Sequence, residues 1–316
     1  MIIFSKIYKA MNYFKIAVFF LITFSCQPLS AQITEKNYKI YSVKLAKEVV
    51  INDIVEDMKA YDVLFYGEEH NDSVTHFLEH KILESLFAKY SNTVTLSMEM
   101  FERDVQPIMN EYLTSEIKEK SFKKDARVWS NYRDYRPMIE LCKKNKLDVI
   151  CANAAGRYSN LAGRKGQKAL MALPAESKKY FAPLPYDTAS GKYYDKLMGL
   201  SHDPADTSKK AAPVMGMGGF SLIMAQSLWD ATMAYSISEY LKNNKTKKIF
   251  QVNGRFHSDE GFAAVTQLKK YSPKTKILII SSAADDSFPN IDWNKHKQLG
   301  DYIIITDPQI PKTYKD

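Results

Sequence analysis

The stretch "YDVLFYGEEHNDSVTHFLEHKI", residues 61–82, joins an apolar run, a polar turn and the start of an amphipathic segment. The run at 62–66 is almost continuously apolar, which favours a strand that is buried on both faces. It ends in "GEEH" (67–70), after which Asn71 or Asp72 can cap a helix. Carboxylates and an imidazole at the end of a buried strand are costly unless they are paired or bind a ligand. The stretch therefore predicts a strand and a helix with a polar site between them.

Similar apolar runs recur along the rest of the chain, at residues 93–98, 147–152, 248–252, 276–281 and 302–306. Helical patterns lie between them, at about residues 131–146, 220–243 and 259–270. Strands that alternate with helices indicate an α/β fold, with a mostly parallel sheet flanked by helices.

A long interruption separates the third and fourth predicted strands. Residues 156–219 are rich in Tyr, Met, Pro and Lys, and they are too long for a simple crossover. Together with the helix that follows, they predict a helical lid inserted between these two core strands. The predicted organisation is an export signal (1–31), the first part of the α/β core (32–155), the lid (156–245) and the second part of the core (246–316).

The N-terminus has the pattern of an export signal, with lysines, the apolar stretch "IAVFFLITFS" (16–25) and then "CQPLSAQ". The apolar stretch is too short for a permanent transmembrane anchor. Two processing routes remain open. Cleavage after Ala31 would release a soluble protein, whereas cleavage before Cys26 would leave a lipidated cysteine that attaches the protein to a membrane. Both routes predict an exported protein of the periplasm or the outer membrane.

The charge is mildly basic. The chain of 316 residues has 44 basic and 36 acidic side chains, a formal charge of +8. The first 31 residues contain three lysines and no acid, so the remainder has 41 against 36, or +5. The excess is spread along the chain, which argues against a nucleic-acid partner and is compatible with a small anionic ligand.

Two cysteines follow the signal, Cys142 late in a predicted helix and Cys151 at the end of a predicted strand. A reversal between helix and strand could bring them together as a disulfide in an exported protein. The favoured interpretation is two buried free thiols.

Polar residues follow the predicted strands, and four of them suggest a site: Glu68, His70, Glu99 and His257. The two histidines occur in matching Gly-x-x-His frames, 67–70 and 254–257. Because the carboxyl ends of parallel strands form the ligand crevice of an open sheet, these side chains are expected to meet. Two imidazoles and two carboxylates could bind a divalent metal or activate a water molecule. The structural alternative is a self-satisfied polar cluster that caps the sheet.

Two further features carry weaker signals. His76 and His80 are spaced i, i+4 on the first predicted helix, away from its apolar stripe, and are expected at the surface or behind the site. Asp230 lies beside Trp229 in an otherwise apolar helix, so it is either paired internally or directed at the crevice.

Tyrosines alternate with arginines in "RVWSNYRDYRPM" (127–138) and "ANAAGRYSNLAGRKG" (152–166). Arginine beside a tyrosine lowers the pKa of the phenol, and phenolate can ligate ferric haem iron. Guanidinium groups could pair with the haem propionates. From spacing alone, ordinary packing of tyrosine on arginine is favoured.

Six motifs carry a resemblance to a known family. They occur in this order: "YGEEHND", "LSMEMFERDVQP", Trp129 with "YRP", "ANAAGRYSNLAGRKG", "AQSLWDATMA" and "VNGRFHSDEG". In this order they resemble the ChaN-type haem-binding uptake proteins, which belong to a larger group with Tiki, TraB and the erythromycin esterases. The resemblance covers nearly all of the predicted mature chain. It implies an α/β core with a helical lid, export to the envelope, and haem held by a tyrosine under the lid, with two haems face to face in a dimer.

Carried onto this sequence, the resemblance implies Tyr158 as the iron ligand, with Tyr135 as second choice, and Arg157 and Arg164 as propionate partners. Where the family commonly has Asn-Ala-Pro-Arg, this chain has Asn-Ala-Ala-Gly at 153–156. A more flexible turn is therefore expected before Arg157.

Two functions follow as hypotheses. The favoured one is an exported, non-enzymatic haem-binding protein that works in haem and iron uptake with an envelope haem transporter. The alternative is a metal-dependent hydrolase of esters or peptides. In it Glu68, His70, Glu99 and His257 would hold Mn, Co or Zn, and His70 or His257 would act as the base.

Overall fold

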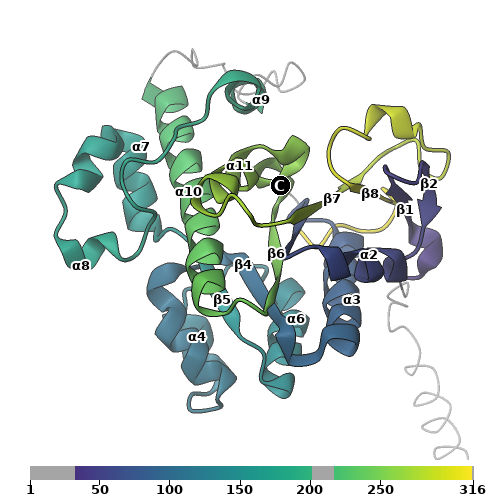
Figure 1. Cartoon of the computed structure of the whole chain (residues 1–316), viewed down its shortest axis with the longest axis horizontal. Helices are drawn as coiled ribbons and strands as arrows, with labels where there is room; N and C mark the ends of the chain where they lie inside the picture. The colour runs from purple at the N-terminus through teal and green to yellow at the C-terminus, as the bar shows by residue number, and fades with distance from the viewer. Residues whose placement is uncertain (1–32, 201–216, 315–316) are drawn as a thin grey trace, which may run out of the picture. The chain divides into compact units, whose positions relative to one another are not determined.

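A mostly parallel sheet forms the centre of the computed structural model, which describes residues 33–200 and 217–314 (Figure 1). Within these residues the strand order is β2-β1-β8-β7-β3-β6-β4-β5. The bounds are β1 Tyr38–Ser42, β2 Lys47–Val49, β3 Val63–Glu68, β4 Val94–Glu102, β5 Val149–Asn153, β6 Lys248–Gly254, β7 Ile277–Ala284 and β8 Tyr302–Thr306. Every residue of β3, β5 and β8 is buried, as expected for strands covered on both faces.

The six strands from β3 to β8 pair with one another in parallel, and each matches a run predicted from the sequence. The predicted α/β fold with a mostly parallel sheet is therefore confirmed. The hairpin β1–β2 was not predicted. It extends the sheet beyond β8 in antiparallel fashion, and its short strands lack a strong apolar pattern.

The helices are α2 Ile51–Asp57, α3 Ser73–Tyr90, α4 Gln106–Leu113, α5 Glu119–Asp125, α6 Tyr132–Asn145, α7 Gly156–Met171, α8 Ala175–Lys178, α9 Gly191–Leu200, α10 Met217–Asn243 and α11 Ala263–Tyr271. Asp72 caps α3, because its carboxylate accepts hydrogen bonds from the backbone amides of Val74 and Thr75 at 2.8 and 3.2 Å. This confirms one of the two predicted caps.

The lid consists of α7, α8 and α9, which lie between β5 and α10 in the chain. Of these, α7 and α9 lie beside the long helix α10 (Figure 1). The later part of α10 belongs to the core, since Met233, Ala234 and Ile237 pack in one cluster with Phe65 of β3 and Ile249 of β6. The lid and the core therefore share α10, and the boundary predicted at residue 245 places its core-packed half in the lid.

Cys142 and Cys151 are buried free thiols, which confirms the favoured interpretation. The export signal, with Cys26 and Ala31, lies outside the described residues, as do residues 201–216 of the predicted lid. None of the described helices combines the length and the hydropathy needed to cross a membrane.

Candidate functional site

A pocket of about 640 Å³ opens where β3, β4, β5 and β6 end. The topology explains its position, because parallel strands bring residues that are distant in sequence to one edge of the sheet. Its lining combines acids, histidines, aromatic rings and two cations: Glu68, Glu69, His70, Asn71, Glu99, Glu102, Trp129, Asn153, Ala154, Gly156, Gln226, Trp229, Gly254, Arg255, Phe256, His257, Lys312 and Tyr314.

Gly254 allows the two Gly-x-x-His turns to approach each other. It lies beside Glu68 in the register of β3 and β6, and its amide donates a 2.7 Å hydrogen bond to Oε2 of Glu99. A Cβ atom at this position would lie 2.8 Å from Nε2 of His70, closer than non-bonded atoms approach. Glycine is needed here because of this close contact, and the backbone does not have a positive φ.

Glu68 is the centre of the first network. Its Oε1 lies 2.5 Å from Nδ1 of His70 and accepts a 2.7 Å hydrogen bond from the hydroxyl of Tyr135. Its Oε2 lies 3.2 Å from Nδ1 of His76. The same nitrogen is 3.3 Å from Oε2 of Glu79, which is one turn further along α3. The side chain of Glu68 is therefore held by partners from α3, α6 and the turn after β3.

His257 is the centre of the second network. Its Nδ1 lies 2.6 Å from Oδ1 of Asp230, and its Nε2 lies 3.3 Å from Oε1 of Glu99. The hydroxyl of Tyr193 donates a 2.7 Å hydrogen bond to Oδ2 of Asp230. Tyr193 belongs to α9 of the lid and Asp230 to α10, so a chain of buried hydrogen bonds connects the lid to the crevice.

Burial and charge act against each other on these groups. Burial works to lower the pKa of His257, but the charges of Glu99 and Asp230 outweigh it and raise that pKa to about 10. Burial raises the pKa of Asp230. Burial would also raise the pKa of Glu99, but the neighbouring charge of His257 lowers it. His257 therefore forms an imidazolium between carboxylates at neutral pH.

The first network behaves similarly. Burial works to lower the pKa of His76, but the charge of Glu79 and the contacts with Glu68 raise it to about 12. Burial and the charge of Glu68 raise the pKa of Glu79 well above its ordinary value. Burial also works to lower the pKa of His70, but the hydrogen bond with Glu68 outweighs it, so this pKa is raised.

The four predicted crevice residues Glu68, His70, Glu99 and His257 all line the pocket. They form two pairs, His70 with Glu68 and His257 with Glu99. Each histidine also packs edge-on against a tryptophan, His70 against Trp129 at 5.2 Å and His257 against Trp229 at 6.4 Å between ring centroids.

The predicted four do not form a compact metal-ligand set in the described part of the chain. The group whose ligand atoms all lie within 4.8 Å of one another is Glu68, His76 and Glu79. The reason is that Glu99 and His257 are bound to each other and to partners from β6 and α10, away from the inner oxygen of Glu68.

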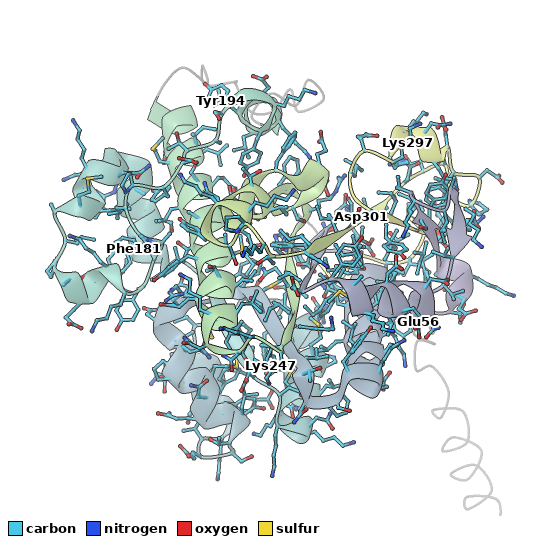
Figure 2. All side chains as sticks on the ribbon, viewed as in Figure 1. Glu56, Phe181, Tyr194, Lys247, Lys297 and Asp301 are labelled. Atoms are coloured by element: carbon cyan, nitrogen blue, oxygen red, sulfur yellow. The ribbon has the colours of Figure 1, made fainter. Side chains whose placement is uncertain are left out.

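The two candidate tyrosines lie in different places. Tyr135 is buried on α6 with its hydroxyl on Glu68, directly behind the pocket. Tyr158 does not line the pocket. It packs near the start of α7 against Phe181 of the lid, with 5.1 Å between ring centroids (Figure 2 labels Phe181). Its ring is buried with Ala162 and Leu170 because the third position of α7 faces the inside of the lid.

The two arginines are exposed on α7. The guanidinium of Arg157 lies over the ring of Tyr158 at 4.5 Å and forms an ion pair with Asp104. The side chain of Arg164 donates a 2.9 Å hydrogen bond to Asn160, one turn away. In the described structure the ring of Tyr158 therefore packs inside the lid and does not line the crevice pocket, and its packing with Arg157 is the ordinary tyrosine–arginine contact.

The sequence pattern did not identify Glu79 or Tyr193 as site residues. For His76 it left two positions open, at the surface or behind the site. His76 is buried behind the site, and the i, i+3 spacing of His76 and Glu79 was the available signal. The sequence predicts that Asp230 either pairs internally or faces the crevice. Both are true, because its partner His257 is a crevice residue. No local signal marks Tyr193, which reaches Asp230 only through the packing of α9.

Comparison with known protein families gives a match over residues 54–268 to the model described as "Haem-binding uptake, Tiki superfamily, ChaN". The chain belongs to this haem-binding uptake family. A comparison with curated protein sequences gives no significant match.

Among solved structures, the chain is similar to ChaN of Campylobacter jejuni, whose structure is described as showing cofacial haem binding. The TM-score is 0.66 at 15% identity, and the match covers 86% of this chain and 98% of ChaN, which shows a shared fold. The type III effector HopBA1 matches with a TM-score of 0.42 at 11% identity, over 81% of this chain and 93% of the effector, and nothing here depends on it.

Proposed function

We propose that this member of the haem-binding uptake family is an exported haem-binding protein that serves haem and iron uptake. Family membership over residues 54–268 is the observation that carries the proposal. The pocket supports it chemically. Trp129, Trp229 and Phe256 offer aromatic surface for a flat apolar macrocycle.

For the iron ligand we propose Tyr158, with Tyr135 as the alternative. Ferric haem iron accepts a tyrosine as its axial ligand, and Arg157 and Arg164 stand exposed on the same helix as Tyr158 for the propionates. Tyr135 is less suited, because burial and the charge of Glu68 raise the pKa of its phenol well above its ordinary value. Ligation by Tyr158 requires its ring to leave the contact with Phe181.

An absorption titration of the purified chain with haemin tests this proposal. We expect a shifted Soret band and saturation at one haem per chain. Tyr158→Phe should change the spectrum and weaken binding at least about tenfold, whereas Tyr194→Phe, at an exposed position on α9, is the matched control (Figure 2). An unshifted Soret band in the wild-type protein would end the haem proposal. Wild-type spectra in both Tyr158→Phe and Tyr135→Phe would end the tyrosine assignment.

The cofacial arrangement described for ChaN leads us to propose that two haems face each other in a dimer of this chain. Sedimentation of the protein with and without haemin should then show a doubling of mass on saturation. A haem-saturated monomer would contradict the dimer without affecting haem binding itself.

Export is proposed from the N-terminal pattern, followed by delivery of haem to an envelope transporter. Mass spectrometry of the protein from its native host should find either Gln32 or a lipidated Cys26 at the N-terminus. A chain that still begins at Met1 and remains in the cytoplasm would contradict this part.

A metal-dependent hydrolase remains the second candidate, favoured by one observation. Asp230 orients His257 in the pocket, and an imidazolium held in this way between carboxylates can donate a proton to a leaving group, the role of a general acid. Hydrolysis of nitrophenyl esters or fluorogenic peptides with added Mn, Co or Zn, abolished by His257→Ala, would support it. If the protein binds haemin in the titration but hydrolyses neither the esters nor the peptides, the hydrolase candidate is contradicted and haem binding is retained.

A further inference from the structure

A second polar cluster lies behind the pocket and shares one wall with it. It consists of Glu68, His76 and Glu79, whose exposed fractions are 1%, 5% and 0%. Glu68 lines the pocket, whereas His76 and Glu79 do not. The carboxylate of Glu68 therefore separates the pocket from this inner cluster, which the haem proposal does not use.

The spacing of the ligand atoms suits a metal ion. Nδ1 of His76 lies 3.2 Å from Oε2 of Glu68 and 3.3 Å from Oε2 of Glu79. A tetrahedral ion with bonds of about 2.0–2.1 Å to nitrogen and oxygen holds its ligand atoms about 3.3 Å apart. The two distances from His76 match this spacing, and the ligand atoms of all three groups lie within 4.8 Å of one another.

The orientation of His76 fits the same role. Its Nε2 lies 3.0 Å from the backbone carbonyl oxygen of His70 and can only donate a proton there. This leaves Nδ1 directed at the two carboxylates. Histidines that bind metals commonly donate their other N–H to a carbonyl group, which fixes the ring and its tautomer.

One carboxylate oxygen in the cluster lacks a hydrogen bond. Among the described residues, Oε1 of Glu79 is buried without a hydrogen-bond partner, and Oε2 of Glu68 has the 3.2 Å contact with the ring of His76. A buried oxygen without a donor costs free energy, which a bound cation would offset. Glu79 could use both of its oxygens, with Oε1 completing the ligand set.

We propose that Glu68, His76 and Glu79 form a buried binding site for a divalent transition-metal ion, with Zn²⁺ as the best-matched ion. One imidazole nitrogen with carboxylate oxygens is a zinc-type ligand set. The ion takes the place of the proton that His76 otherwise holds between the carboxylates. It stiffens the turn that presents His70 to the pocket, because Glu68 and the carbonyl of His70 both contact the site.

The test measures metal content and thermal unfolding of the full chain. Protein treated with EDTA and then exposed to Zn²⁺ should retain one ion per chain after gel filtration. Its unfolding temperature should rise by at least about 4 °C relative to the metal-free protein. The isosteric variant Glu79→Gln, and also His76→Gln, should bind Zn²⁺ at least about tenfold more weakly and lose most of this rise.

Two control variants locate the ion. His80→Gln changes the next histidine along α3 and should retain the ion, and His257→Gln tests the crevice instead. Each variant is compared with its own metal-free form, so a general loss of stability does not imitate a loss of binding. Circular dichroism establishes that Glu79→Gln is folded.

Two results would overturn the proposal. One is a wild-type protein that binds no Zn²⁺ and unfolds at the same temperature with and without it. The other is binding that survives both His76→Gln and Glu79→Gln, or that is lost only in His257→Gln. A haemin titration of the same variants keeps the two proposals apart, since haem binding can fail while zinc binding holds.

Discussion

The crevice and the exposed face of α7 hold their polar groups in opposite ways. In the crevice, Glu68, Glu99 and His257 are buried, and each contacts partners from other elements of the fold. On α7, Arg157 and Arg164 are exposed. The crevice groups are therefore part of what holds the fold together, whereas the arginines of α7 can be changed at little cost. Substitutions in the crevice will alter stability and binding together, and those on α7 will report on binding alone.

The largest effect is expected from Asp230→Asn. The raised pKa of His257 contributes stability that is fully present below its ordinary pKa of 6.5 and is lost as the pH rises towards about 10. Removing one carboxylate partner should lower the free energy of unfolding by about 3 kcal/mol at pH 6. It should also flatten the decline of stability between pH 6.5 and 10. Urea unfolding at pH 6 and pH 9 measures both.

Asp187→Asn is the control for this substitution. Asp187 pairs with Lys270 at the surface, where its side chain is 66% exposed, so its loss should change stability by less than about 0.5 kcal/mol. Equal effects of the two substitutions would show that the crevice carboxylate is no more important to the fold than a surface one.

A somewhat smaller effect is expected from Gly254→Ala. The added Cβ would lie 2.8 Å from Nε2 of His70, so the imidazole must move out of its place beside Glu68. We expect a loss of about 2 kcal/mol and an altered NMR signal of His70. Gly199→Ala has nothing within 4 Å of the added atom and serves as the matched substitution. An unchanged His70 signal in Gly254→Ala would mean that the close contact does not position the ring.

Tyr193→Phe tests the hydrogen bond that connects the lid to the crevice. It removes the hydroxyl that donates to Asp230 and should cost about 1–2 kcal/mol, because a buried carboxylate oxygen loses its donor. Its neighbour Tyr194 is 41% exposed, and Tyr194→Phe should be nearly neutral. Thermal unfolding of the pair distinguishes a lid that is bound to the crevice from one that merely lies near it.

The smallest effect on stability is expected from Arg164→Gln, within about 0.5 kcal/mol, because the side chain is exposed and bonded only within its own helix in the described structure. If Arg164 pairs with a haem propionate, the same variant should bind haemin more weakly, and the difference should shrink at high salt. If Arg164→Gln binds haemin as tightly as the wild type at both low and high salt, Arg164 does not pair with a propionate.

The crevice residues could be predicted because their positions follow from the sheet. Glu68 ends β3, His257 follows β6 and Glu99 follows the apolar run that begins β4, and parallel strands bring such positions to one edge. The detailed partners could not be predicted in this way. His76 was expected at the surface or behind the site, and its burial depends on how α3 packs against α6.

Tyr158 shows the opposite outcome. The family resemblance implied that its phenol is an iron ligand under the lid, but in the described structure its ring packs against Phe181. Sequence spacing gives the face of a helix on which a residue lies, but it does not give the neighbour that the face meets. That depends on residues 180–186 and on α10, which pack against α7.

The sequence by itself determined the alternation of strands and helices, the polar turns at the strand ends and the family. These depend on local hydrophobic periodicity and on motifs that survive in order. Only the tertiary structure decided that the four crevice residues form two pairs, that Glu68 also contacts an inner cluster with His76 and Glu79, and that Tyr193 reaches Asp230. Those contacts join residues far apart in the chain, and their distances depend on how helices pack on the sheet, which no local pattern encodes.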